Sequence, residues 1–173
     1  GCMVANITLT KDDYSEVHEE LHKIAVEAQH IKDELVYAVD NDTNAFNDVI
    51  EAMRLPKSTQ EEKSIRTKAI QDGYKKATLI PFKTAELSFE AVKICKRIAE
   101  IGNVNSISDA GVGILAARSG VIGGIMNVLI NLPNITDKEF TENIKSKLNE
   151  MRTQSDLIEK EVLEIVLAKI SEL

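Results

Sequence analysis

The segment from Asp12 to Arg54 constrains the fold of this chain most, because it contains no proline and no glycine that would end a helix. Apolar residues recur along it at alternating spacings of four and three, at Val17, Leu21, Ile24, Ala28, Ile31, Leu35 and Ala38. Such a heptad seam lies on one face of a helix and packs against a partner. The segment therefore predicts a long helix with one buried face.

The next position of the same seam is Asp42, after which the seam resumes at Ala45 and Val49. If the helix is continuous there, a carboxylate lies on an otherwise apolar face, where an unpaired charge costs on the order of several kcal/mol. Such a residue is a candidate for chemistry. The alternative is that the helix ends near Asp40 and that Asp42 caps a new helix, because Asp is a favoured N-cap and the surrounding residues have poor helix propensity.

The rest of the chain also predicts helices. Pro56 ends the long segment, Thr59-Gln-Glu-Glu62 matches a capping box, and Pro81 suits the first turn of a further helix. A second capping box, Thr136-Asp-Lys-Glu139, precedes a last helix with another seam, at Ile144, Leu148, Met151, Ser155, Ile158, Val162 and Ile165. We expect an all-α fold, a multihelical bundle with long antiparallel helices, in a single domain over residues 1–173.

Six of the eight glycines fall between Gly102 and Gly124. Five of them lie inside an expected helix, where each costs about 1 kcal/mol relative to Ala: Gly111, Gly113, Gly120, Gly123 and Gly124. Helices keep such glycines where another backbone or a flat ligand approaches closely, and tight packing alone is an equal alternative for the last three. Ser108 and Asp109 can cap this helix and leave its first amides free for a ligand. Asn127 and Asn131 lie on one face and must be hydrogen-bonded, either to the fold or to a ligand.

Charge and cysteine content narrow the function classes. A net charge of −7 argues against nonspecific binding to nucleic acid. Cys2 and Cys95 are too few for a disulfide framework, which indicates a cytoplasmic protein. The apolar runs look too short to cross a bilayer, so we expect no membrane partner. The two seams predict a homodimer. His18-Glu-Glu-Leu-His22 matches the H-E-x-x-H zinc pattern, but with no clear third ligand we expect a solvated helix face and no metal.

Four ordered motifs together carry a family resemblance: Asp40-x-Asp42-x-x-Ala45-Phe46, Leu55-Pro56-Lys57, Gly102-Asn103 with Ser108-Asp109, and Asn127-Val-Leu-Ile-Asn-Leu132. Across nearly its whole length the chain resembles the cyclodeaminase domain of formiminotransferase-cyclodeaminase and the stand-alone methenyltetrahydrofolate cyclohydrolases. The resemblance implies an all-helical dimer that acts on the one-carbon bridge of tetrahydrofolate without metal or cofactor. Relatives begin with a glycine-rich loop and helix ahead of the segment equivalent to Met3, which this chain is expected to lack.

The resemblance also implies roles for particular residues. Asp42 would act as the base and stabilise the cationic substrate, with Asp40 as the second candidate. Lys57 and Arg66 would bind the glutamate carboxylates of the substrate. The remaining residues assigned to substrate binding are Asn105, Ser108, Asp109 and Asn127.

Three functions stay open at this point. The first is a cyclohydrolase that converts 5,10-methenyltetrahydrofolate to 10-formyltetrahydrofolate. The second is a cyclodeaminase that converts 5-formiminotetrahydrofolate to 5,10-methenyltetrahydrofolate with loss of ammonia. Both reactions pass through a tetrahedral intermediate and need the same proton transfers, so the residues do not separate them. The third is a helical scaffold without catalytic activity.

Overall fold

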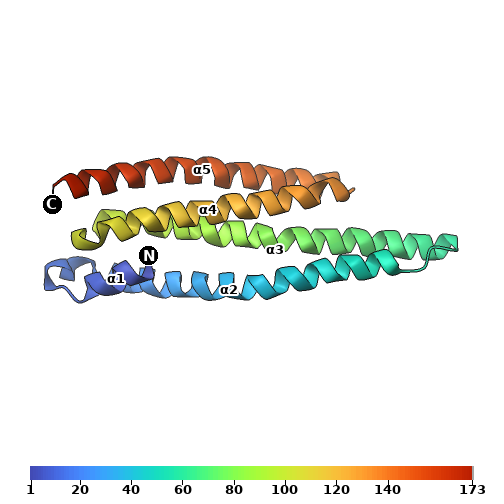
Figure 1. The fold of residues 1–173 in the computed structure, drawn as a ribbon, viewed down its shortest axis with the longest axis horizontal. Helices are drawn as coiled ribbons and strands as arrows, with labels where there is room; N and C mark the ends of the chain where they lie inside the picture. The colour runs from blue at the N-terminus through green and yellow to red at the C-terminus, as the bar shows by residue number, and fades with distance from the viewer. Residues whose placement is uncertain (173) are drawn as a thin grey trace.

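A computed structural model describes residues 1–172, apart from the side chains of residues 40–44. It is a bundle of antiparallel helices (Figure 1), and the described residues contain no strand, which confirms the all-α prediction. The elements in chain order are α1 (Cys2–Leu9), the 3-10 helix η1 (Asp12–Val17), α2 (His18–Arg54), α3 (Gln60–Ile101), η2 (Val104–Ser106), α4 (Ile107–Asn131), η3 (Leu132–Asn134) and α5 (Lys138–Ser171).

Two long helical hairpins make up the bundle. α2 and α3 form one, α4 and α5 form the other, and α4 lies against α3 so that the two hairpins share a core (Figure 1). α2 ends at Arg54, before Pro56. Thr59 opens α3 with the predicted capping box, accepting from the backbone of Glu62 while the Glu62 carboxylate accepts from the backbone of Thr59.

α2 is a single helix of 37 residues from His18 to Arg54. The alternative in which a helix ends near Asp40 and Asp42 caps a new one is therefore wrong. The side chains of Asp40 and Asp42 lie outside the described residues. On either side of them, Ala38 is half-buried, and Ala45 and Val49 are buried against α3, as the continuous seam requires.

The apolar seams of α2 and α5 are both buried within the core of a single chain. Leu21, Ile24 and Ile31 of α2 are buried in the main core together with Leu148 and Val162 of α5. The α2 face packs against α3 and α1, and the α5 face packs against α3 and α4, so each stripe finds its partner within the bundle. The prediction that the two seams join two copies of the chain is therefore wrong.

Pro81 does not begin a helix but lies inside α3. A proline in a helix interior has no N–H to donate to the carbonyl four residues earlier, so the carbonyl of Ala77 loses its helical donor. The side-chain amide of Asn131 on α4 donates to that carbonyl instead, at 3.1 Å. The helix passes through Pro81 because a neighbouring helix satisfies the freed group.

Two expected caps are also corrected. α4 begins at Ile107 with Ser106 as its N-cap, so Ser108 and Asp109 lie in the first turn instead of capping it. α5 begins at Lys138, and its N-cap is Asp137, whose carboxylate accepts from the backbone of Phe140 at 3.0 Å. In both cases the N-cap residue lies within two residues of the expected one; Asp137 accepts a capping hydrogen bond through its side chain, whereas Ser106 does not.

The segment Val104–Asn134 is long and apolar enough to cross a membrane, with a mean hydropathy of 1.6 over its most apolar window. This corrects the expectation that every apolar run is too short. Length and composition alone are weak evidence of a membrane span, because core helices of globular proteins meet the same measure. Here α4 packs between α3 and α5, and 28% of that window is buried.

Candidate functional site

A furrow runs between α2 and α4, with α3 as its floor. One part of it is a cavity of about 480 Å³ next to the α2 segment that contains Asp40 and Asp42. This cavity is lined by Leu35, Ala38, Val39, Ile80, Pro81, Thr84, Gly120, Gly123, Gly124 and Asn127. Because Val39 lines it and Asp40 follows directly in the same helix, the predicted catalytic segment lies at the edge of this cavity.

The glycines of α4 serve two different purposes. A Cβ atom at Gly124 would lie 2.8 Å from both the Ala85 Cβ and the Pro81 carbonyl oxygen, and one at Gly120 would lie 2.5 Å from the Ser88 hydroxyl. These two glycines allow α4 to pack closely on α3. A Cβ at Gly123 would meet nothing within 4 Å. Gly123 therefore leaves open space on the wall of the furrow.

The two asparagines of α4 have different roles: Asn131 stabilises the fold, and Asn127 faces the furrow. Asn131 holds the Ala77 carbonyl that Pro81 leaves without a donor. Asn127 is exposed, lines the furrow, and donates only to the Gly123 carbonyl of its own helix, at 3.2 Å. Of the pair, Asn127 is the one placed to meet a ligand.

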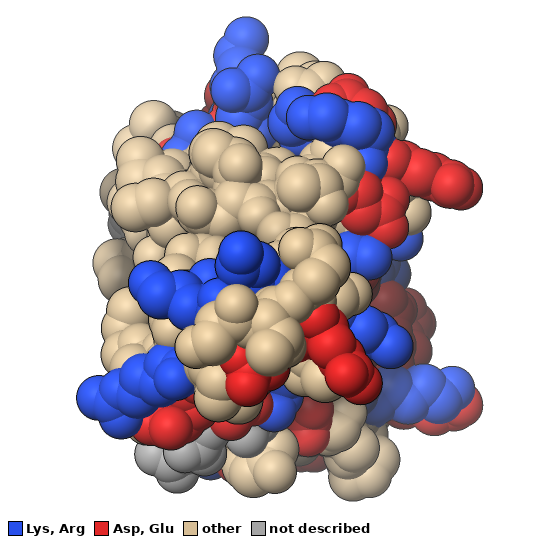
Figure 2. All heavy atoms as spheres, turned by 90° about the vertical axis from the view of Figure 1, so that its right-hand side faces the viewer, with Lys and Arg blue, Asp and Glu red and all other residues tan. Residues whose placement is uncertain are grey.

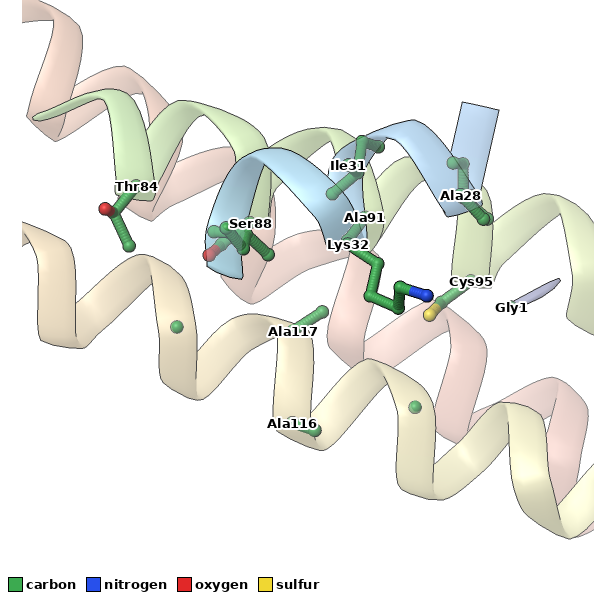
Figure 3. A pocket seen from close by; sticks show the side chains of 14 residues that line it. Gly1, Ala28, Ile31, Lys32, Thr84, Ser88, Ala91, Cys95, Ala116 and Ala117 are labelled. Carbon is green, nitrogen blue, oxygen red and sulfur yellow. The ribbon is translucent and has the colours of Figure 1, made fainter. Parts of the chain in front are cut away.

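A second cavity of about 460 Å³ continues the furrow toward the amino end of the chain (Figure 3). It shares Leu35, Thr84 and Gly120 with the first cavity. Small side chains form most of its wall, and Cys95 and Lys32 also line it. Burial raises the pKa of the Cys95 thiol, which keeps it protonated and a poor nucleophile.

Lys57 and Arg66 lie at the α2–α3 turn, beyond the furrow. Lys57 is exposed, while Arg66 donates through Nε and Nη2 to the Met53 carbonyl at 3.2 and 3.1 Å and so holds the end of α2. Figure 2 shows this end of the molecule, where Lys and Arg are interspersed with acidic side chains around an area without charged residues. About 18 Å of helix separate Asp42 from Arg54, the end of α2.

Asn105, Ser108 and Asp109 are exposed at the opposite end of α4. Asn127 follows Ser108 by nineteen positions, and at 1.5 Å per residue they lie about 28 Å apart along the helix. The structure thus brings Asn127 to the α2 segment that contains Asp42, but it does not bring Asn105, Ser108 and Asp109 there within one chain.

The histidines of α2 do not form a cluster with further ligands. His18 is hydrogen-bonded through Nε2 to the Lys11 carbonyl at 3.1 Å, His22 is exposed, and Glu19 pairs with Lys23 at 2.7 Å. Among residues whose side chains are described, no group of three His, Cys, Asp or Glu side chains is positioned to hold a metal ion.

Residues 1–150 match the sequence pattern of the formiminotransferase-cyclodeaminase family. This chain belongs to that family. Methenyltetrahydrofolate cyclohydrolase of Methylorubrum extorquens is 32% identical over 169 residues, covering 98% of this chain and 81% of the relative. Formimidoyltransferase-cyclodeaminase of Rattus norvegicus is 33% identical over 160 residues, covering 90% of this chain and 30% of the relative.

The fold agrees with that of a solved cyclodeaminase. The crystal structure of formiminotetrahydrofolate cyclodeaminase from Thermotoga maritima has a TM-score of 0.86 and 25% identity to this chain, and the match covers 98% of this chain and 80% of the other. The chain therefore spans about four fifths of these two bacterial proteins and less than a third of the rat protein.

Several residues that line the furrow are not among those predicted from the sequence. Thr84, Ser88, Ala91 and Cys95 follow one another on α3 at spacings of four, three and four and form its floor. The signal was present in these spacings.

Proposed function

We propose that this protein is a methenyltetrahydrofolate cyclohydrolase whose reaction takes place in the furrow beside Asp42. The observation that carries the proposal is the open cavity between Val39 on α2 and Asn127 on α4, next to the one acidic position in the α2 seam. The 32% identity to the Methylorubrum extorquens cyclohydrolase, over 98% of this chain, supports this choice of reaction.

The chemistry needs few groups. Methenyltetrahydrofolate is an amidinium cation, and water adds to its bridging carbon to give a tetrahedral intermediate. One C–N bond then opens: the hydroxyl becomes the formyl C=O and gives up its proton, the departing nitrogen takes up a proton, and the formyl group stays on the other nitrogen. A carboxylate at the reacting carbon stabilises the cation and removes a proton from the water, and Asp42 takes this role, with Asp40 as the second candidate. Asn127 lies on the facing wall and orients the substrate through its amide.

A wider substrate site extends from this centre. Lys57 and Arg66 supply positive charge for the substrate's glutamate carboxylates at the α2–α3 turn. Asn105, Ser108 and Asp109 lie too far along α4 to join the same site within one chain, so they contact substrate only if a second chain places its α4 end near the furrow. The reaction requires no metal or cofactor.

A cyclodeaminase is the second candidate, and the likeness to the Thermotoga maritima cyclodeaminase over 98% of this chain favours it. The test is to supply purified protein with each substrate separately, following the loss of methenyltetrahydrofolate absorbance or the release of ammonia from 5-formiminotetrahydrofolate. Turnover of the first substrate alone supports the cyclohydrolase. Turnover of the second supports the cyclodeaminase, and turnover of neither leaves the helical scaffold.

We also infer a cytoplasmic homodimer. Cys2 and Cys95 are both free thiols, which suits a reducing compartment. Val112, Met126 and Ile130 are 67%, 65% and 72% exposed along one face of α4, and such an apolar strip is typical of a contact with another protein surface. Sedimentation at micromolar concentration tests the dimer, and Met126→Glu is expected to shift the protein to monomers. If Met126→Glu sediments with the same mass as the original protein, α4 does not form the dimer contact.

A further inference from the structure

The cavity beside the α2 segment that contains Asp42 has few polar groups. Among the described residues that line it, only Thr84 and Asn127 have a polar side chain. Asn127 is exposed on α4, whereas Thr84 is half-buried on α3, on the floor of the furrow. Ala38, one helical turn before Asp42 in α2, lines the same cavity. Thr84 therefore supplies the hydroxyl on this part of the lining, next to the predicted catalytic segment.

The hydroxyl of Thr84 leaves its oxygen free to accept a hydrogen bond. It donates to the Ile80 carbonyl of its own helix, at 3.3 Å. A threonine hydroxyl has one hydrogen to donate and two lone pairs to accept, so the oxygen can still accept from a group in the cavity. In Figure 3 this hydroxyl points away from Ser88. Ser88 itself lines only the other cavity, and its hydroxyl is closed in by Gly120, where a Cβ atom would lie 2.5 Å away.

The two candidate reactions differ in whether they consume water. In the hydrolysis of methenyltetrahydrofolate, a water oxygen bonds to the bridging carbon. In the cyclodeamination of 5-formiminotetrahydrofolate, the attacking atom is a nitrogen of the folate itself, ammonia leaves, and methenyltetrahydrofolate is the product. The product of one reaction is thus the substrate of the other. A group that holds a water molecule at the bridging carbon favours hydrolysis and has no step to perform in deamination.

We propose that Thr84 positions the attacking water and thereby sets the site for hydrolysis. This role rests on the proposed function. The water donates one hydrogen bond to the carboxylate of the base and one to the Thr84 oxygen, which leaves a lone pair of the water directed at the bridging carbon. As the C–O bond forms, the electron pair of the C=N bond moves onto nitrogen, and the carboxylate takes the first proton. Thr84 keeps its own proton, donated to the Ile80 carbonyl, throughout the step.

The test uses three variants on α3 with methenyltetrahydrofolate as the substrate. Thr84→Val keeps the shape of the side chain and removes the hydroxyl, and Thr84→Ser keeps the hydroxyl. Thr78→Val is the matched control, because Thr78 donates to the carbonyl four residues earlier at 2.8 Å and does not line the cavity. We expect kcat of Thr84→Val to fall about tenfold while KM and Tm are maintained, and kcat of the other two variants to stay within about threefold of the original protein.

The kcat of Thr84→Val separates the role of Thr84 from the reaction itself. If the original protein hydrolyses methenyltetrahydrofolate and Thr84→Val is equally fast, the role of Thr84 is overturned and the proposed function stands. A loss in Thr84→Ser as large as that in Thr84→Val overturns the role as well, because the hydroxyl alone is then not sufficient. A raised KM with unchanged kcat would place Thr84 against the substrate instead of the water. If the original protein does not hydrolyse methenyltetrahydrofolate, the proposed function fails and the role of Thr84 with it.

Discussion

The side-chain amide of Asn131 donates to the carbonyl oxygen of Ala77 at 3.1 Å, across the contact between α4 and α3. The Ala77 carbonyl is the one that Pro81 leaves without its helical donor. A buried carbonyl without a partner costs free energy of unfolding comparable to a lost hydrogen bond. This one contact explains how α3 passes unbroken through a proline on the floor of the candidate site.

Asn131→Ala is therefore expected to lower the free energy of unfolding by about 1 kcal/mol. In a Pro81→Ala background the restored N–H at position 81 donates to the Ala77 carbonyl, so the same substitution should cost much less. Denaturant unfolding of the four proteins of this double-mutant cycle measures the coupling. An equal loss in both backgrounds would show that Asn131 does not compensate for Pro81.

Alanine substitutions at two neighbouring glycines of α4, Gly123 and Gly124, should change the free energy of unfolding in opposite directions. Gly123→Ala should raise the free energy of unfolding by about 0.5–1 kcal/mol, because its Cβ meets nothing and alanine favours the helix. Gly124→Ala should lower it, because its Cβ would lie 2.8 Å from the Pro81 carbonyl oxygen and the Ala85 Cβ. Thermal melts of both variants provide the measurement. Stabilisation by Gly124→Ala would mean that α3 and α4 are not in this close contact.

The N-cap of α5 predicts a pH dependence of stability. Lys75 Nζ lies 2.7 Å from the Asp137 carboxylate, and its hydrogen bond, together with the backbone N–H of Phe140, lowers the pKa of Asp137. A carboxyl group whose pKa is lower in the folded protein adds stability that is complete above its unfolded pKa of about 3.9 and is lost as pH falls through the folded pKa.

Asp137→Asn keeps the cap but removes the charge, so its Tm should fall below that of the original protein at pH 7 and approach it below about pH 4. Asp72→Asn, an exposed position on α3, is the matched control and should behave like the original protein at every pH. A difference for Asp137→Asn that persists unchanged at pH 3 would show that the lost stability does not come from the Asp137 charge.

The fold could be predicted from local patterns, and the site only in part. The seam at Leu21, Ile24 and Ile31 and the capping box at Thr59 are set by neighbours within a few residues, so the sequence identifies them. The continuity of α3 through Pro81 depends on Asn131, which lies fifty positions later on a different helix. Sequence patterns that consider only neighbouring residues cannot predict this contact. The seams also indicate that a partner exists without saying whether it is the same chain or a second copy.

Lys57→Ala tests the distant part of the substrate site. Removal of one charge-assisted contact should cost about 1.5–3 kcal/mol of substrate binding, so KM should rise with little change in kcat. The increase should be larger for a polyglutamated folate than for a monoglutamate. Lys63→Ala, an exposed lysine nearby on α3, is the control. If the two variants behave alike on both substrates, Lys57 contributes only to solubility.

The most direct test of the proposed function is the turnover number of Asp42→Asn with methenyltetrahydrofolate. Asparagine keeps the volume of the side chain but cannot carry a charge or accept the proton from water. Asp48→Asn, on the same helix and exposed beside Lys76, is the matched control. We predict that kcat of Asp42→Asn falls by about 10²–10⁴ with the melting temperature maintained, while Asp48→Asn stays close to the original protein. Full activity of folded Asp42→Asn would contradict the account.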